Sequence, residues 1–177
     1  SLKRQLAQAA ADAEVKAIVL RINSPGGEVT ASDVLYNAVK KAAAVKPVVV
    51  HMDSVAASGG YYVACGATKV VASETTLTGS IGVIMESINY ADLFGKVGLG
   101  MNTFTSGAFK DSLSGARPMR EDEKAYIQNL VSQMYDRSLG IDPDHPLAAR
   151  GSQQLVIAEH VATTSTSDVA ALVRCDK

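Results

Sequence analysis

The strongest candidate for chemistry in this sequence is a serine in a run of small residues. Ser58 stands in Ala-Ala-Ser-Gly-Gly-Tyr-Tyr, between an apolar stretch typical of a buried strand and the expected start of a helix. A hydroxyl at that place can act as a nucleophile, because the free N–H groups of a helix N-terminus favour developing negative charge. Serine is also a frequent helix N-cap, and the local sequence alone favours the capping role.

Glycines close to Ser58, and in an earlier loop, are candidate oxyanion donors. Gly59 follows the serine and lets a backbone N–H approach a substrate carbonyl closely. Gly26 and Gly27 end the loop Asn-Ser-Pro-Gly-Gly, which follows another apolar strand, and they offer a second set of donors. Ligands of open α/β sheets bind at the carboxyl ends of strands, so these loops are where we expect a site.

A nucleophilic serine needs a general base, and the histidines are poorly placed for that role. His51 stands inside an expected strand, whereas His145 and His160 lie in or beyond the C-terminal tail. The Gly-x-Ser-x-Gly pattern of α/β-hydrolases is also absent. We therefore expect no Ser-His-Asp triad. Among the lysines after Ser58, Lys110 alone stands in a loop of small or apolar neighbours.

A lysine acts as a base only when its amine is neutral. A free lysine has a pKa of about 10.4, so the amine needs a pKa about three units lower, which desolvation can supply. The adjacent Asp111 would oppose this change unless its side chain points the other way. The alternative is an ordinary surface lysine, which residue type and spacing alone favour.

Composition excludes several functional classes. The chain has 177 residues, of which 47% are apolar and 20% charged, and this suits one domain with a sizeable core. A net charge of -1 gives no bulk attraction to nucleic acid, so we expect no nucleic-acid partner. The two cysteines fit no metal-ligand spacing and no phosphate-binding glycine motif is present, so we expect neither a metal nor a cofactor.

Strands and helices alternate over the first 140 residues, which predicts an α/β fold with a largely parallel sheet. Helices are expected over 2–13, 32–45, within 56–66, over 90–97 and over 121–139, and strands over 15–22, 48–52, 69–73, near Val83 and over 101–105. A break near Asp142 separates an expected core domain, 1–140, from a tail, 141–177. In the tail we expect a strand over 155–161 and a helix over 167–174.

Four stretches together resemble the signal peptide peptidase A family of serine proteases. They are RINSPGGEVTASD at 21–33, DSVAASGGYYVA at 53–64, TLTGSIGVI at 76–84, and TSGAFKD with RPM and DE between 105 and 123. They come in the family's order and at its spacing within residues 15–139. SPGG alone also occurs in Clp-protease and crotonase-like proteins, whereas the four stretches together are specific.

The resemblance implies a Clp-protease/crotonase-like fold of stacked βαβ units with a mostly parallel, spiralling sheet. It implies that Ser58 is the nucleophile, Lys110 the general base and Ser80 a hydroxyl that orients the lysine. Gly59 and the Gly26-Gly27 pair would supply the oxyanion donors. The implied reaction is peptide hydrolysis through an acyl-enzyme, without metal or cofactor, on remnant signal peptides and on other apolar or unfolded peptides.

The resemblance also implies an assembly and a location. Members form homo-oligomeric rings, in which the base and the nucleophile can come from neighbouring subunits. They act at the cell membrane on its extracytoplasmic side, so we expect the chain itself to be soluble and an anchor and a first strand to precede it. The tail does not match the family's ending, which is a Gly-Leu-Val-Asp stretch after a helical segment.

Other functions stay open from the residues themselves. An acyl-CoA-binding crotonase-like protein would hold a thioester oxyanion in the glycine loops, although no basic cluster stands near them to meet CoA phosphates. A phage-type head-maturation protease would act on capsid scaffold, and the RPM and DE residues favour the cellular type over it. A non-catalytic scaffold would keep the fold and lose the dyad, but both Ser58 and Lys110 are present.

Overall fold

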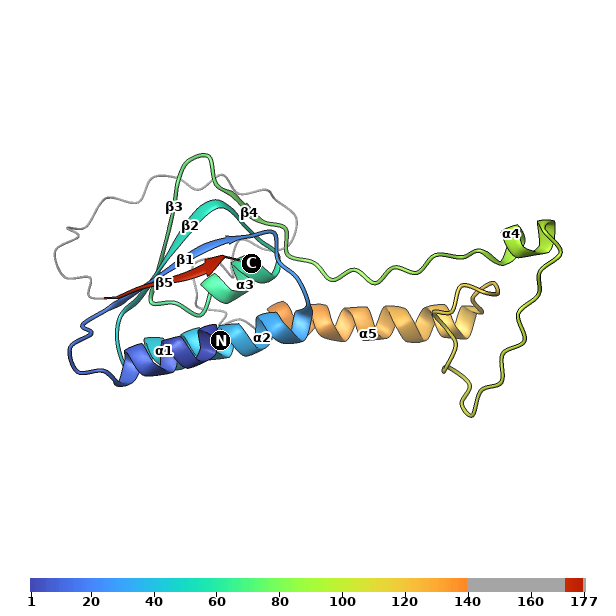
Figure 1. Cartoon of the computed structure of the whole chain (residues 1–177), viewed down its shortest axis with the longest axis horizontal. Helices are drawn as coiled ribbons and strands as arrows, with labels where there is room; N and C mark the ends of the chain where they lie inside the picture. The colour runs from blue at the N-terminus through green and yellow to red at the C-terminus, as the bar shows by residue number, and fades with distance from the viewer. Residues whose placement is uncertain (140–170, 177) are drawn as a thin grey trace. The chain divides into compact units, whose positions relative to one another are not determined.

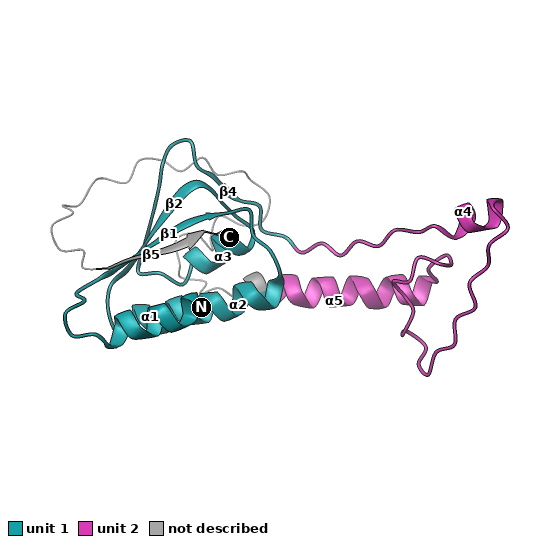
Figure 2. Ribbon diagram, in the orientation of Figure 1, with its two compact units in different colours: residues 1–82, 137–177 teal, residues 83–136 magenta. Residues whose placement is uncertain are grey.

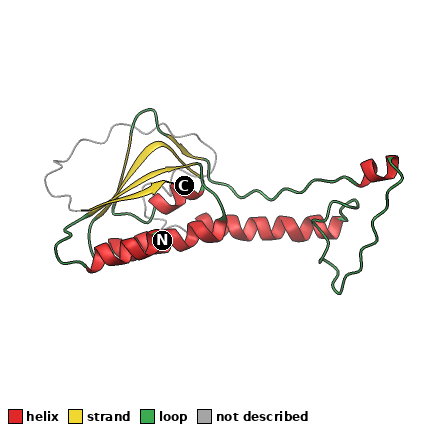
Figure 3. Cartoon of the chain, in the orientation of Figure 1, coloured by secondary structure: helices red, strands yellow, loops and turns green. Residues whose placement is uncertain are grey.

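The β-branched runs of the sequence pair as a parallel sheet (Figure 1 and Figure 3). The computed structural model describes residues 1–139 and 171–176. Within them the sheet order is β3-β2-β1-β5, and β4 also pairs with β2. The strands are β1 (Ile18–Ser24), β2 (Val48–Ala57), β3 (Lys69–Ala72), β4 (Leu77–Gly79) and β5 (Ala171–Asp176). Every pairing among them is parallel, so the carboxyl ends of these strands meet at one edge.

Three helices pack on the same side of this sheet in Figure 1: α1 (Leu2–Ala11), α2 (Val29–Ala43) and α3 (Gly59–Ala64). Helix α2 begins at Val29 because the Glu28 carboxylate accepts hydrogen bonds from the N–H groups of Thr30 and Ala31, at 2.8 and 2.6 Å. These bonds hold the pKa of Glu28 below its ordinary value, which keeps the cap charged near neutral pH. The loop that carries Gly26 and Gly27 therefore runs directly into a capped helix.

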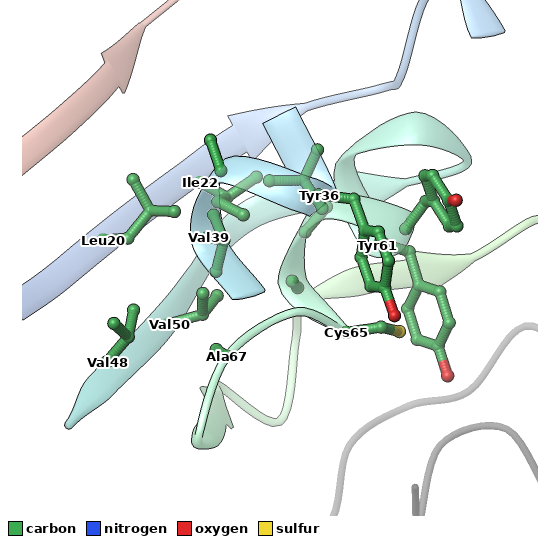
Figure 4. Close-up of a cluster of buried hydrophobic side chains, with 14 of the residues drawn as sticks. Leu20, Ile22, Tyr36, Val39, Val48, Val50, Tyr61, Cys65 and Ala67 are labelled. Atoms are coloured by element: carbon green, nitrogen blue, oxygen red, sulfur yellow. The ribbon is translucent and has the colours of Figure 1, made fainter. Parts of the chain in front are cut away.

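The hydrophobic core lies between the sheet and these helices (Figure 4). Strands β1 and β2 bury alternate residues, which is the period of a sheet with one covered face. Each aliphatic side chain taken out of water contributes roughly 1.5–3 kcal/mol. Core residues on the strands and helices include Ile18, Leu20, Ile22, Val39, Val48, Val50, Met52, Tyr61 and Cys65. Burial raises the pKa of the Cys65 thiol to about 12, so this cysteine stays protonated.

The chain divides into two units, shown in teal and magenta in Figure 2. Unit 1 consists of residues 1–82 and the part that begins at Arg137, and unit 2 consists of residues 83–136. Unit 2 contains α4 (Ala91–Lys96) and most of α5 (Glu121–Leu139). In the single chain it exposes many large apolar side chains, among them Ile84, Ile88, Leu93, Val97, Leu99, Met101 and Phe104.

The expected fold class is confirmed, because the described strands form a parallel sheet with helices between them in sequence. The helix predicted over 121–139 coincides with α5. The strand predicted over 101–105 is wrong: these residues form a loop, and Met101 and Phe104 are exposed. Their apolar pattern has no neighbouring strand to pair with among the described residues, and a strand needs such a neighbour.

The helix predicted over 167–174 is wrong where the structure describes it, since Ala171–Asp176 forms β5 and pairs with β1. The strand expected near Val83 is wrong: residues 80–90 form no strand, and the strand closest before them is β4, at Leu77–Gly79. The strand predicted over 155–161 falls outside the described residues. The division into 1–140 and 141–177 stays a prediction. No helix within 1–139 combines the length and hydropathy that a bilayer crossing requires.

Candidate active site

Ser58 has a backbone conformation that residues with a side chain rarely adopt. It follows β2 directly and precedes α3, with φ 51° and ψ -119°. Among the described non-glycine residues, only Ser58 and Ser80 have a positive φ. Such a conformation costs on the order of 1–3 kcal/mol, persists only where the surrounding structure imposes it, and is found mainly at functional sites.

The Ser58 hydroxyl is not used to cap the helix. Ser58 occupies the N-cap position of α3, yet its side chain makes no capping hydrogen bond. The interpretation of Ser58 as a structural cap is therefore wrong. The structure leaves a half-buried hydroxyl on a strained strand-to-helix turn, which resembles the arrangement that presents serine nucleophiles in α/β-hydrolases.

Strand β4 imposes this turn from one side. The Ser58 N–H donates to the Gly79 carbonyl oxygen at 2.8 Å, and Ala57 is the register partner of Gly79. One residue earlier on each strand, the Thr78 hydroxyl donates to the Ala56 carbonyl oxygen at 2.8 Å. Because the strands are parallel, Ser80 leaves β4 beside the place where Ser58 leaves β2. Ser80 is exposed at this edge of the sheet.

Tyr62 anchors α3, the helix after Ser58, against α2. Its hydroxyl donates to Asp33 Oδ1 at 2.7 Å, and its ring stacks on Tyr36 with the ring centroids 4.7 Å apart. Burial raises the pKa of Tyr62 above its ordinary value, and the Asp33 carboxylate raises it further. The hydroxyl therefore stays protonated, and remains a donor to Asp33, at every physiological pH. This bond helps to hold α3 in place directly after the Ser58 turn.

The glycine loop after β1 packs directly against Ser58. Gly26 has φ 103°, and a Cβ at this position would lie 2.7 Å from Ser58 Cβ and 2.8 Å from the Gly59 nitrogen. The Gly27 nitrogen lies 3.4 Å from the place that a Cβ on Gly59 would occupy. Only glycine allows so close an approach of two backbones in this conformation. The two predicted sources of oxyanion donors therefore converge beside the Ser58 side chain.

The backbone N–H donors of Gly26, Gly27 and Gly59 are not equivalent. The Gly26 N–H donates to Ser24 Oγ at 3.2 Å. For the N–H groups of Gly27 and Gly59, the structure records no acceptor within residues 1–139 and 171–176. Of the three expected donors, the Gly26 N–H is thus already bound to a side chain, and those of Gly27 and Gly59 have no recorded acceptor in this part of the chain.

We predict that Gly26→Ala destabilises the protein by about 2 kcal/mol or more, because the methyl group would clash with the Ser58 turn and alanine at this φ is strained. Chemical denaturation measures the free energy of unfolding. Gly27→Ala is the matched control: no atom lies within 4 Å of its added Cβ, and we expect a change of less than about 0.5 kcal/mol. Equal stability of the two variants would show that the loop does not press on Ser58.

A pocket of about 160 Å³ opens beside the same glycines. Gly26, Gly27, Gly59 and Gly60 form one wall of it. The remaining wall is mostly apolar and includes Leu2, Leu20, Ile22, Leu35 and Val63, from α1, β1, α2 and α3. A mostly apolar cleft next to convergent polar groups is a common arrangement in binding sites. The structure therefore has a mostly apolar pocket next to the Gly26-Gly27 loop and the start of α3.

Lys110 belongs to unit 2, whereas Ser58, Ser80 and the three glycines belong to unit 1. The lysine is exposed and lies in a series of turns between residues 106 and 113, where its N–H donates to the Gly107 carbonyl oxygen at 3.2 Å. Unit 1 brings together five of the six predicted site residues at the carboxyl ends of β1, β2 and β4.

The carboxylate next to Lys110 is bound by an arginine. Arg117 donates from Nε to Asp111 Oδ2 at 3.0 Å and from Nη2 to Asp111 Oδ1 at 2.9 Å. These hydrogen bonds hold the pKa of Asp111 below its ordinary value. Arg117 also donates to Glu123, whose side chain is 0% exposed and whose pKa it lowers to about 2. The sequence analysis considered Asp111 only as a charge next to Lys110 and the other two residues only as part of a family motif, and it missed that the three pair.

Comparisons with known proteins identify the family. The model of Peptidase family S49 matches residues 40–140, and the Clp protease model matches residues 1–78. A protein of Methanocaldococcus jannaschii is 42% identical over 124 residues, which are 70% of this chain and 40% of that protein. Protease 4 of Salmonella typhi is 46% identical over 141 residues, which are 79% of this chain and 23% of that protein.

The chloroplastic serine protease SPPA of Arabidopsis thaliana is 40% identical over 121 residues, which are 68% of this chain and 18% of that protein. The chain thus spans 40% or less of the length of each of these relatives. The S49 model covers more than half of the chain and includes Ser58, Ser80 and Lys110. The chain therefore belongs to peptidase family S49, the family of signal peptide peptidase A.

Proposed function

We propose that this chain carries the catalytic residues of a serine endopeptidase, with Ser58 as nucleophile and Lys110 as general base. The observation that carries the proposal is the turn at Ser58, where an uncapped hydroxyl on a positive-φ residue stands beside the glycine N–H groups. Membership of family S49 supports a peptidase. The names of two relatives, Protease 4 and serine protease SPPA, support the same activity.

In the acylation step, the neutral amine of Lys110 takes the proton of Ser58 Oγ while this oxygen attacks the carbonyl carbon of the scissile bond. The new C–O bond moves the carbonyl π electrons onto the carbonyl oxygen. The N–H groups of Gly27 and Gly59 donate to the oxyanion, which stabilises the tetrahedral state. Gly26 contributes to this hole through its missing side chain, because the loop could not otherwise reach Ser58.

The tetrahedral state collapses when the C=O bond re-forms and the C–N bond breaks. The protonated amine of Lys110 gives its proton to the leaving nitrogen, so the first product departs as a neutral amine and the acyl group stays on Ser58. Water then attacks the ester, and the Lys110 amine takes its proton. The proton finally passes to Ser58 Oγ as the acid product leaves, which restores the enzyme.

We assign Ser80 the role of orienting the lysine amine. It stands one residue beyond Gly79, whose carbonyl oxygen accepts the Ser58 N–H. Its exposed hydroxyl at the same sheet edge can accept a hydrogen bond from an amine that approaches Ser58. Its positive φ is the second strained conformation of the site.

The proposed substrates are remnant signal peptides and other apolar or unfolded peptides. The apolar lining of the pocket beside Gly27 and Gly59 supports this preference. We further propose a homo-oligomeric ring at the extracytoplasmic face of a membrane, in which Lys110 serves Ser58 of its own or of a neighbouring subunit. The exposed apolar side chains of unit 2 support burial against a second copy.

A fluorophosphonate probe tests the proposal directly. We expect covalent labelling of the native protein, and mass spectrometry of its peptides should place the label on Ser58, because only an activated serine displaces the fluoride. Ser54→Ala, an exposed serine in the same strand, should label like the wild type. Peptide hydrolysis that proceeds with the label on another residue would refute the nucleophile. An acyl-CoA-binding protein would leave the probe unreacted.

A further inference from the structure

We propose that Arg117 is a positioning residue for Lys110, which fixes the turn that carries the lysine and neutralises the carboxylate next to it. The inference deepens the proposed function and rests on the role given there to Lys110. It concerns unit 2 alone.

The residues before Lys110 are tied to helix α5 and to the loop that enters it. Arg120 Nη2 donates to the Ala108 carbonyl oxygen at 3.1 Å. The Phe109 ring stacks on Tyr126 of α5, with the centroids 4.7 Å apart and the planes 19° from parallel. A stacked aromatic pair of this kind contributes about 0.5–1.5 kcal/mol beyond its buried area. The backbone that leads to Lys110 is therefore held by one hydrogen bond, at Ala108, and by one aromatic contact, at Phe109.

The residues after Lys110 are tied as well. Arg117 holds Asp111 with two hydrogen bonds, at 3.0 and 2.9 Å. The hydroxyl of Ser112 lies 3.0 Å from the Phe109 carbonyl oxygen and 3.3 Å from Glu123 Oε1. Lys110 itself is exposed, although its sequence neighbours on both sides are bound. The Lys110 amine therefore extends from a turn whose backbone is held in place on both sides.

Arg117 connects the turn to a buried carboxylate. While two of its nitrogens face Asp111, its Nη1 donates to Glu123 Oε2 at 2.8 Å. Glu123 also accepts the backbone N–H of Arg120 at 2.8 Å, which satisfies an unpaired donor at the start of α5. The planar guanidinium can meet two carboxylates in fixed directions, whereas a lysine in its place could not hold both in this geometry.

Asp111, Arg117, Arg120, Asp122 and Glu123 pair with one another, and within the described residues the structure records no ion pair for Lys110. Arg117 and Arg120 face the carboxylates of Asp111, Asp122 and Glu123, so two positive charges meet three negative ones and leave a net charge of -1. Two further charged pairs are recorded for described residues of α5, Lys124 with Glu121 at 2.6 Å and Arg137 with Asp33 at 3.7 Å. Loss of Arg117 would make the charge of this group -2 and would leave Asp111, the residue after Lys110, without its partner. A negative charge at this place favours the protonated amine, which cannot act as a base.

The test is the pH dependence of kcat/KM for peptide hydrolysis by the full chain in its active assembly. We expect Arg117→Gln to move the acid limb of the profile to higher pH by about one unit, which is an approximately tenfold loss on that limb. The double variant Asp111→Asn with Arg117→Gln should return the limb to its wild-type position, since it removes both charges. Arg117→Lys should keep the limb and lower the turnover.

Two results would overturn the inference. One is an Arg117→Gln profile that falls by the same factor at every pH, which a merely structural role would produce. The other is an unchanged acid limb in Asp111→Asn, a variant that can be measured even if Arg117→Gln does not fold. Asp111→Asn keeps the size of the side chain and leaves Arg117 in place, so its acid limb should move to lower pH, and an unmoved limb contradicts us. Full activity of Lys110→Met would instead refute the proposed function, whatever Arg117 does.

Discussion

Replacement of Ser58 by alanine is expected to lower kcat/KM for an apolar peptide ester by roughly 10⁴-fold or more, because no other group can form the acyl-enzyme. The protein should still fold. Alanine keeps a Cβ at the same positive φ, and the removed hydroxyl caps nothing. Initial rates measure the loss, and thermal unfolding compares the stability of the variant with that of the wild type.

Ser54→Ala provides the matched control for this experiment. Ser54 lies in the same strand and is exposed, so its loss should leave kcat/KM within about twofold of the wild type. Wild-type turnover by Ser58→Ala would mean that the nucleophile is another residue. A collapse of both variants would indicate damage to β2 rather than to the chemistry.

The second large effect is expected for Lys110→Met. Methionine keeps most of the apolar stem and removes the amine, so the loss should equal the contribution of a general base, about 10²–10⁴-fold in kcat/KM. Lys96→Met is the control, because Lys96 lies in the same unit, in the last turn of α4, with no assigned role. If Lys110→Met retains near wild-type turnover, another group must accept the serine proton.

Mixed assemblies of the two inactive variants locate the base relative to the nucleophile. If Lys110 serves a neighbouring subunit, subunits that lack Ser58 supply the amine to subunits that lack Lys110, and the mixture regains part of the activity. If it serves its own subunit, the mixture stays inactive. The comparison needs subunits that exchange before the assay, which labelled copies can verify.

The parts of the site that depend on residue type were predictable from the sequence. The small residues around Ser58 and the two glycines after β1 marked the loops that the structure brings together. The conformation of Ser58 was not predictable in this way, because it depends on a hydrogen bond to Gly79, more than twenty residues further along the chain. A local pattern contains no information about such a partner, so it could not separate a nucleophile from a helix cap.

Two of the incorrectly predicted elements have a similar physical origin. Residues 167–174 include Ala170, Ala171 and Leu172, which favour a helix, yet pairing with β1 makes Ala171–Asp176 a strand. Tertiary context of this kind commonly overrides intrinsic preference. Residues 101–105 show the reverse, since their apolar pattern suits a strand that finds no partner in the described part of the chain.

The pairing of Arg117 with Asp111 and Glu123 was also missed, although a signal existed. Arg117 stands six residues from each of these acids, on a segment interrupted by Pro118. A proline before the acidic first turn of a helix marks a chain reversal, and a reversal can bring both acids to one guanidinium. The arginine could therefore have been proposed as their partner without any knowledge of the fold.

The parallel pairing of β2 with β4 has a consequence for how this family can vary. Ala57 faces Gly79 across the ladder, so Ser58 and Ser80 are neighbours because of strand register and not because of the number of residues between them. Insertions or deletions between α3 and β4 can therefore change the length of the chain while both hydroxyls stay in place. A slip of one residue in the ladder would separate them without altering a single site residue.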